Sequence, residues 1–214
     1  ATLQLFTLNA SFEAGPKPWA LDLARLLAPA ASFSAVLLAL VRLLGQRARL
    51  AGMRRHVVVC GLGAKGLHLV TQLAAEGRRV VAIDRAPEAG ALTSARSLGV
   101  EVIAGDATMD RVLRQSRLDR ATDLVALCGE DAANLAVAMA AERETLARRR
   151  AKAPALCAHV HLARLDWCAS FRSLGLFAAS RGRFEATAVN VFEAAARAAF
   201  LAHPLDREPV GPAD

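Results

Sequence analysis

The stretch HVVVCGLGAKGLHLV, residues 56–70, decides the fold of this chain. It opens with a β-branched run that is typical of a buried strand, and it continues into a segment with the apolar periodicity of a helix. Three glycines, Gly61, Gly63 and Gly66, separate the two patterns. A tight turn alone needs one glycine, whereas a strand–loop–helix that binds a phosphate needs several at these intervals. The context therefore favours a phosphate-binding loop over a plain turn.

The G-x-G-x-x-G spacing predicts a separate role for each glycine. Gly61 allows a sharp turn, Gly63 lets the backbone approach a pyrophosphate, and Gly66 lets the helix pack close to the sheet. The N–H groups and the positive dipole end of the first helical turn attract anions. Lys65 lies in that turn, where a cation is unfavourable unless an anion is near. We therefore assign phosphate binding to Gly61, Leu62, Gly63, Ala64, Lys65 and Gly66.

An acidic residue at the end of the next predicted strand extends the candidate site. Asp84 ends the run RRVVAID, at the position where a carboxylate accepts hydrogen bonds from both ribose hydroxyls and repels a 2′-phosphate. This predicts NAD or NADH rather than NADP. Arg85 leaves a second interpretation open, because its guanidinium could accept a phosphate or stack on adenine. A helix-capping role is the structural alternative for Asp84.

Short strands alternate with helices throughout the central part of the chain. This alternation predicts βαβ units with right-handed crossovers, hence an α/β, Rossmann-like, doubly wound parallel sheet with helices on both faces. The predicted strands are 56–60, 79–84, 100–104, 123–128 and 156–162, and the predicted helices are 65–76, 88–98, 109–116 and 131–149.

Polar residues follow the third and fourth predicted strands, at the sheet edge where ligands of open α/β sheets bind. Asp106, in the segment AGDAT, is placed to meet an adenine amino group or a ribose, although capping of the next helix is an equal alternative. In CGEDAANL, Glu130 and Asp131 are expected to cap the fourth helix. Asn134, one turn later, is expected to face either the crevice or a partner.

The first fifty residues have a different composition. The run LLAPAASFSAVLLALV, residues 26–41, carries no charge, and Leu43 and Leu44 extend it if Arg42 snorkels. This length is slightly below the ~20 residues of a typical bilayer span. The arginines at 42, 47, 49, 54 and 55 predict that everything after residue 50 is cytoplasmic and that the protein resides in the cell membrane. A buried helix or an amphipathic surface helix is the alternative.

Beyond residue 163 the pattern weakens. It predicts a short helix over 167–174, a sixth strand over 176–179 and an alanine-rich helix over 184–201 that could pack closely on a partner helix. The proline-rich tail AHPLDREPVGPAD is expected to be a linker or a cut end, and the initial Ala suggests a piece of a longer protein. The expected segments are a membrane helix with a basic linker (1–50), a nucleotide-binding domain (51–163) and a helical extension (164–214).

Composition argues against several classes of function. The formal net charge is +7, but the chain has no Tyr and only 5% aromatic residues, so the cations are not interleaved with the stacking residues that single-strand nucleic-acid binding uses. The four cysteines are far apart, which disfavours a disulfide framework or a zinc site and fits a reducing compartment. His159 and His161 could share one face of a strand, but no third metal ligand is evident in the sequence.

The segments GLGAKG, VVAIDR, GVEVIAGDAT and RATDLVALCGEDAANLAVAMAA resemble, in order and spacing, the RCK (KTN, TrkA-N-like) domain. This domain is the cytoplasmic nucleotide-binding module that regulates prokaryotic potassium channels and transporters. The resemblance covers about residues 55–162 well and 163–201 loosely. It implies pairing of two copies through the helix near the C-terminus. It also implies a ligand, NAD or NADH with ATP or ADP as alternatives, that contacts the glycine loop, Asp84, Arg85, Gly105, Asp106, Ala107, Thr108 and Glu130.

Two features differ from the family pattern. No T-x-G-Y-G selectivity filter is present, and AHVHLARLDWCASFRSLGLF departs from the more usual I-A-R-A pattern after the fifth strand. The expected function is a nucleotide-dependent regulatory domain of a membrane-bound channel or transporter. An NAD-dependent oxidoreductase is the first alternative, although without Tyr a tyrosine–lysine catalytic pair is impossible. A membrane-tethered scaffold with a structural nucleotide is the second.

Overall fold

The computed structural model describes residues 19–150 and 152–202. The expected linker at the C-terminus lies almost entirely outside the described residues. The chain divides into two compact units, Ala1–Ala51 and Gly52–Asp214, which we describe separately.

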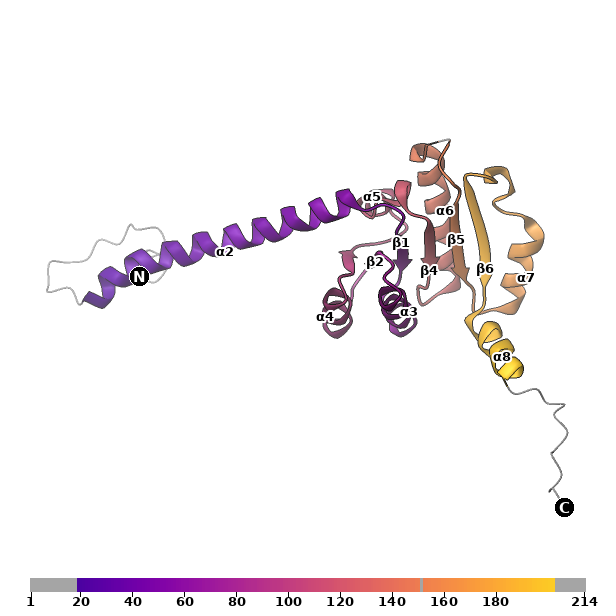
Figure 1. The fold of residues 1–214 in the computed structure, drawn as a ribbon, viewed down its shortest axis with the longest axis horizontal. Helices are drawn as coiled ribbons and strands as arrows, with labels where there is room; N and C mark the ends of the chain where they lie inside the picture. The colour runs from indigo at the N-terminus through magenta and orange to yellow at the C-terminus, as the bar shows by residue number, and fades with distance from the viewer. Residues whose placement is uncertain (1–18, 151, 203–214) are drawn as a thin grey trace, which may run out of the picture. The chain divides into compact units, whose positions relative to one another are not determined.

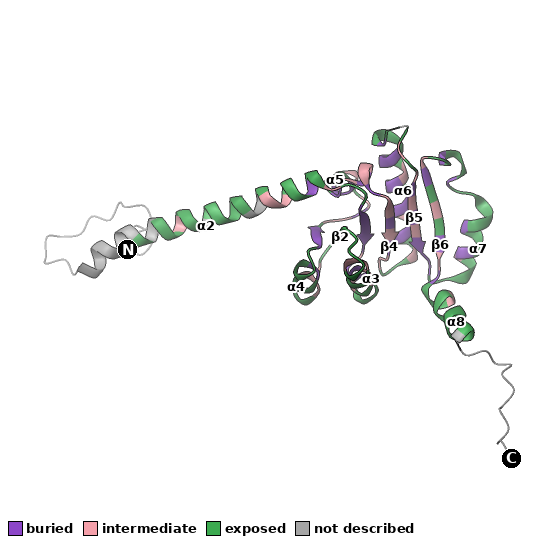
Figure 2. Cartoon of the chain, in the orientation of Figure 1, coloured by how far each residue is buried: buried purple, intermediate pink, exposed green. Residues whose placement is uncertain are grey.

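The first unit is represented by one helix, α2 (Trp19–Gly52). By length and apolar composition, its segment Ala30–Gly52 qualifies as a membrane span, with a mean hydropathy of 1.3. Apolar side chains such as Phe33, Val36 and Leu38 are exposed along it, as the green ribbon of Figure 2 shows. The sequence therefore predicted the helix correctly, and its insertion in a membrane stays a prediction.

The second unit is built on a six-stranded sheet with the order β3-β2-β1-β4-β5-β6 (Figure 1). Every neighbouring pair is parallel, as the doubly wound prediction requires. Central strand β1 pairs on both sides, with Val58 opposite Val81 and Leu124. The strands are β1 (Val57–Cys60), β2 (Val80–Asp84), β3 (Glu101–Ala104), β4 (Asp123–Ala126), β5 (Leu156–His161) and β6 (Phe184–Val189).

Helices cover both faces of this sheet. The right-handed crossovers place α3 and α4 on one face, where they contact each other and β1–β3, and α5, α6 and α7 on the other. The helices are α3 (Ala64–Ala75), α4 (Ala89–Ser97), α5 (Asp110–Gln115), α6 (Asp131–Arg148), α7 (Leu165–Leu174) and α8 (Val191–Ala202), with short 3-10 turns at Leu118–Arg120 and Ala178–Ser180.

The core explains why the β-branched runs form strands. All four residues of β1 are buried, because a central parallel strand is covered on both faces. Val57 and Val59 pack with Val70 of α3 and Ala95 of α4 in one apolar cluster. Burial of such side chains contributes about 1.5–3 kcal/mol each.

Two predictions near the C-terminus are wrong. Residues 176–179, expected to be a strand, include the start of the 3-10 turn Ala178–Ser180. A helix was expected over 184–201, but residues 184–189 form strand β6 and the helix begins only at Val191. Phe184 and Ala188, which are buried, are four residues apart, and this spacing fits both a helical and a strand period. Pairing with β5 selects the strand.

Candidate functional site

A cavity of about 480 Å³ lies at the carboxyl edge of the sheet. Its walls come from the turns that follow β1, β2, β3 and β4, which parallel pairing brings to one edge. Every residue that the sequence assigned to a ligand lines this cavity except Leu62 and Gly66. The lining residues are Gly61, Gly63, Ala64, Lys65, Ile83, Asp84, Arg85, Gly105, Asp106, Ala107, Thr108, Leu127, Cys128, Gly129, Glu130, Ala133 and Val137.

The three glycines of the first turn differ in what requires them. Gly61 has a φ of +100°, and a β-carbon there would lie 2.7 Å from the carbonyl oxygen of Leu127. At Gly66 a β-carbon would overlap the carbonyl oxygen of Gly61. A β-carbon at Gly63 would meet nothing within 4 Å, and its φ of −69° suits any residue. The fold therefore requires Gly61 and Gly66, but it does not require a glycine at position 63.

The carboxylate of Asp84 is held directly beside this turn. Its Oδ2 accepts a hydrogen bond from the backbone N–H of Leu62 at 2.6 Å, and its Oδ1 accepts one from Ala86 at 2.9 Å. This is how Leu62, whose side chain is buried, takes part in the site. A carboxylate has about four lone-pair sites, so Asp84 retains acceptor capacity toward the cavity.

Asp106 is already engaged by the protein. Its Oδ1 accepts hydrogen bonds from the backbone N–H of Thr108 at 2.9 Å and from its hydroxyl at 2.7 Å. Its Oδ2 pairs with Arg85 at 3.0 Å. The hydrogen bonds from Thr108, with a smaller contribution from Arg85, lower the pKa of Asp106. Asp106 thus stabilises the turn that precedes α5 without capping that helix, whose N-cap residue is Met109, and it still faces the cavity.

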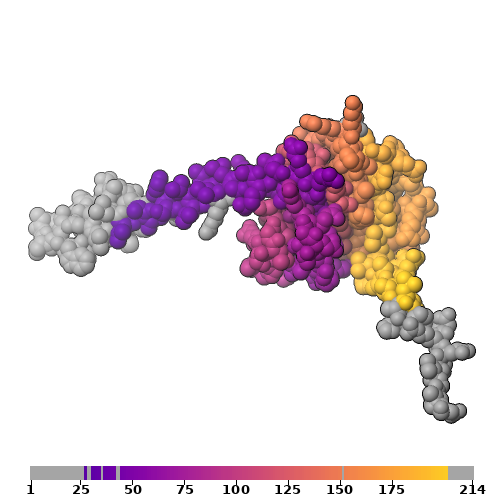
Figure 3. All heavy atoms as spheres, viewed as in Figure 1, coloured from indigo at the N-terminus to yellow at the C-terminus, as the bar shows by residue number. Residues whose placement is uncertain are grey.

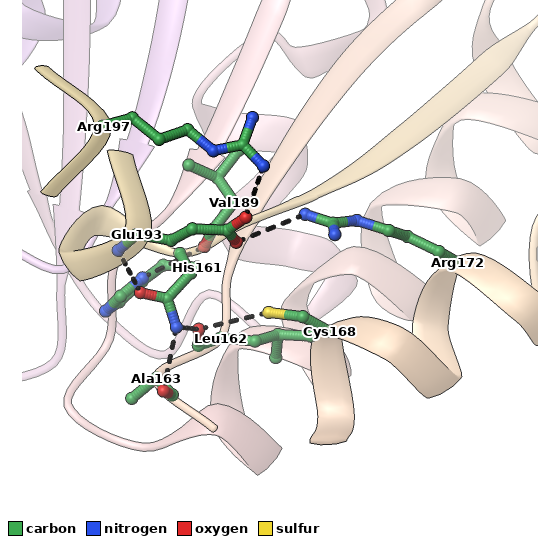
Figure 4. A network of polar contacts seen from close by, with 9 residues as sticks. His161, Leu162, Ala163, Cys168, Arg172, Val189, Glu193 and Arg197 are labelled. Atoms are coloured by element: carbon green, nitrogen blue, oxygen red, sulfur yellow. Dashed lines mark hydrogen bonds and ion pairs between the residues drawn. The ribbon is translucent and has the colours of Figure 1, made fainter. Parts of the chain in front are cut away.

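Lys65 links the cavity to the C-terminal part of the chain. Its Nζ lies 2.8 Å from Nε2 of His161, at the end of β5, and 5.4 Å from the ring centre of Phe192 in α8. The other ring nitrogen of His161 lies 3.2 Å from the carbonyl oxygen of Val189 (Figure 4). A neutral ring satisfies both contacts, with Nδ1–H donating to Val189 and Nε2 accepting from Lys65. No pattern in the sequence predicts this contact.

Two polar residues of α6 fix the strand ends around the cavity. Asn134 is fully buried: its Oδ1 accepts from the N–H of Cys128 at 2.6 Å, and its Nδ2 donates to the carbonyl oxygens of Cys128 and His161. It therefore faces neither the crevice nor a partner. Asp131 accepts from the N–H groups of Ala163 and Arg164 instead of capping its own helix.

Glu130 occupies the N-cap position of α6, but its side chain makes no capping hydrogen bond. It is exposed at the cavity wall, which leaves its carboxylate available to a ligand. Sequence analysis missed the apolar part of the wall, which Ile83, Leu127 and Val137 provide. Their apolar character signalled burial, not a place in the site. Within residues 19–150 and 152–202, no group of three His, Cys, Asp or Glu side chains is arranged to hold a metal ion.

Comparison with known proteins agrees with this geometry. Residues 57–159 match the family model of the TrkA-N domain. A segment of 89 residues is 32% identical to the voltage-gated potassium channel Kch of Escherichia coli strain K12, and it covers 41% of this chain and 21% of Kch. The matches span only about a fifth of the full-length curated relatives.

Two solved structures share the fold. One is the NAD(P)-binding domain of an exopolyphosphatase-related protein from Archaeoglobus fulgidus, with a TM-score of 0.53, 20% identity, and coverage of 70% of this chain and 97% of that chain. The other is the TrkA-N domain of the inner membrane protein YbaL from Escherichia coli, with a TM-score of 0.52, 17% identity, and coverage of 71% and 98%.

Proposed function

From the premise that residues 57–159 are a TrkA-N domain, we propose that the cavity at the carboxyl edge binds a nucleotide and that this binding regulates a membrane-bound potassium channel or transporter. In this proposal the domain acts as a ligand-dependent switch rather than as an enzyme. It lies on the cytoplasmic side of the cell membrane, and the apolar run 26–44 of α2, which overlaps the candidate span Ala30–Gly52, crosses the bilayer. The named relatives that support this proposal are a potassium channel and an inner membrane protein.

The observation that carries the nucleotide proposal is Gly63. Contacts within the protein explain why Gly61 and Gly66 must be glycine. Position 63 has room for a larger side chain, yet it is also a glycine. A β-carbon at this position would stand at the cavity wall, beside the first N–H groups of α3. A bound pyrophosphate would occupy that space, and the helix N-terminus would stabilise its charge.

The remaining roles follow from the position of each group. The N–H groups of Gly63, Ala64 and Lys65 would bind the phosphates, and Asp84 would accept hydrogen bonds from a ribose. We expect Gly105, Asp106, Ala107 and Thr108 to contact the adenine, Arg85 to flank it, and Glu130 to line the part of the cavity near a second ribose or nicotinamide. The free acceptors of Asp84 favour NAD or NADH over NADP. ATP and ADP would use the same phosphate and ribose contacts.

The contact between Lys65 and His161 offers a route from the ligand to α8. A phosphate on the first turn of α3 would compete with His161 for the Lys65 ammonium group. His161 also contacts Val189, and the next residue, Asn190, donates hydrogen bonds to Leu162 and Ala163 and caps α8 through the N–H of Glu193 (Figure 4). If a bound phosphate removes the contact between Lys65 and His161, the contacts at the start of α8 would therefore change.

The surface of α8 fits a second copy of the chain. Phe192, Phe200 and Leu201 are 63%, 58% and 84% exposed, and Figure 2 shows most of this helix in green. Large exposed apolar side chains on one short helix indicate a partner. Homodimerisation through α8 would let a nucleotide-dependent change in one copy reach the other.

Calorimetry of the full chain in detergent, titrated with NAD, NADH, NADP, ATP and ADP, tests the ligand. We expect Asp84→Ala to weaken NAD binding at least tenfold, because a carboxylate that accepts two ribose hydroxyls contributes about 1.5–3 kcal/mol. Asp166→Ala removes an exposed carboxylate outside the cavity and should leave the affinity unchanged. Absence of binding by any of the five nucleotides would refute the proposal, and equal affinity for NADP would shift the ribose role to Arg85.

Hydrogen exchange of α8 with and without the bound nucleotide tests the switch. Exchange should change on binding in the native chain but not in Lys65→Met, which lacks the ammonium group and so has no contact to release. Binding without any change in α8 would instead support the scaffold alternative, in which the nucleotide is structural.

A further inference from the structure

A second cavity, of about 650 Å³, lies at the opposite, amino edge of the sheet. Its walls come from the segments that precede β1, β4 and β5, and the loop that joins α6 to β5 lies at this edge in Figure 1. Orange side chains from this region stand out from the surface in Figure 3. Among the lining residues the charge is strongly one-sided, with one carboxylate, Asp119, and six arginines: Arg54, Arg55, Arg120, Arg148, Arg149 and Arg150.

Arg149 is the most deeply placed of these arginines, with only 6% of its surface exposed. Its guanidinium donates hydrogen bonds to the carbonyl oxygens of Pro154 at 2.7 Å and Ala121 at 2.9 Å. Burial lowers the pKa of Arg149, which means that its cationic form is partly desolvated. Carbonyl dipoles, rather than a close ion pair, therefore accommodate a buried positive charge beside the cavity.

The other arginines fall into two groups. Arg120 and Arg148 have carboxylate partners, Asp119 at 3.5 Å and Glu144 at 2.9 Å. The remaining three have no ion pair with any residue in the described parts of the chain, and all are exposed: Arg54, Arg55 and Arg150.

Stabilisation of a helix end explains only part of this cluster. Cations favour the C-terminus of a helix, so Arg148–Arg150 are well placed at the end of α6. Arg54 and Arg55 lie just beyond the C-terminus of α2, which cations also favour, but that preference does not require them to line this cavity. They add two unneutralised charges to the same concavity, where like charges repel unless an anion is present.

We propose that the arginines of this cavity bind the phosphate of an anionic lipid headgroup. Guanidinium groups bind phosphate oxygens through paired, charge-assisted hydrogen bonds, and several of them converge here. Arg54 is two residues beyond Gly52, the last residue of α2, so the chain allows at most about 7 Å between their Cα atoms. A basic cavity so close to the end of a membrane helix would meet the headgroup region, where anionic lipids attract arginine.

This site is separate from the nucleotide site in position and in its residues. Its preference for a lipid rests on the proposal that α2 spans the membrane, whereas its affinity for a phosphate group does not. A free soluble phosphate is the other source of the same chemistry, and the experiment separates the two.

The test is calorimetry of the full chain in neutral detergent, titrated with short-chain phosphatidylglycerol, phosphatidylcholine or inorganic phosphate. We expect binding of phosphatidylglycerol only. The variant Arg54→Gln/Arg150→Gln should bind it about 25-fold more weakly, or about fivefold for each arginine. The control Arg96→Gln/Arg111→Gln removes the same charge from exposed positions outside the cavity and should retain the native affinity.

Three outcomes would overturn the proposal: no binding of phosphatidylglycerol, equal binding of phosphatidylcholine, or equal losses in the two double variants. Binding of inorganic phosphate alone, lost in Arg54→Gln/Arg150→Gln, would replace the lipid with a soluble ligand. Nucleotide affinity should be the same in all these chains, so failure at one site is distinguishable from failure at the other.

Discussion

The two edges of the same sheet carry opposite kinds of cavity. At the carboxyl edge, the carboxylates Asp84, Asp106 and Glu130 face the first turns of α3 and α6. At the amino edge, arginines surround the end of α6 and the starts of β1, β4 and β5. Parallel topology explains the difference, because it gathers positive helix N-termini at one edge and negative C-termini at the other. A doubly wound sheet therefore offers two electrostatically distinct sites, and substitutions at each edge test this contrast.

The largest effect is expected at the carboxyl edge, from Gly66→Ala. The added methyl group would overlap the carbonyl oxygen of Gly61, so the turn or α3 must move. We expect a loss of about 3 kcal/mol or more in the free energy of unfolding, measured by urea denaturation. Gly63→Ala is the matched control and should change it by less than about 1 kcal/mol while weakening nucleotide binding. Equal destabilisation by both would contradict the distinction between the glycines.

Asn134→Ala should rank next. The substitution removes three hydrogen bonds and leaves the N–H and carbonyl of Cys128 and the carbonyl of His161 without their partner. Because these groups lie between β4 and β5, we expect a loss of about 2–3 kcal/mol in urea denaturation. A change below about 0.5 kcal/mol would show that this amide does not hold the strand ends together.

At the amino edge, Arg149→Leu tests whether a buried cation stabilises the fold. The carbonyl oxygens of Pro154 and Ala121 lose their donor, but the cost of desolvating a charge disappears as well. We expect a net loss of about 1–2 kcal/mol in the free energy of unfolding. Arg150→Leu, on an exposed neighbour, should be neutral, and a stabilised Arg149→Leu chain would contradict the role assigned to Arg149.

The smallest effect should be a pH dependence from His56, which is fully buried just before β1 and contacts the carbonyl oxygen of Ser116 at 2.8 Å. Burial lowers its pKa below the usual 6.5. The unfolded chain therefore binds a proton more readily, and stability should fall as pH drops from about 6.5 through the lower folded pKa. Urea midpoints at about pH 7.5 and about pH 5.5 measure this, and His56→Gln should show a weaker dependence.

Sequence reasoning succeeded where a pattern had one physical interpretation. The β-branched runs of β1 and β2 predicted buried strands, which the structure confirms. The glycine spacing predicted a tight turn, and Gly61 and Gly66 are required by close contacts within the fold. It failed where one spacing of apolar residues fits both a helix and a strand, as for Phe184 and Ala188 in β6. It also left Asn134 undecided, because an amide one turn into a helix has the same local pattern whether it faces a ligand, a partner or the core.

The sequence by itself determined the alternation of strands and helices, the glycine turn and the identity of nearly every polar group in the candidate nucleotide cavity. These are local properties of spacing and residue type. Only the tertiary structure decided that Lys65 contacts His161, that Asp131 holds the segment after β5, and that arginines from three segments meet at the amino edge. The physical reason is that these contacts join residues far apart in the chain, and sheet order alone brings them together.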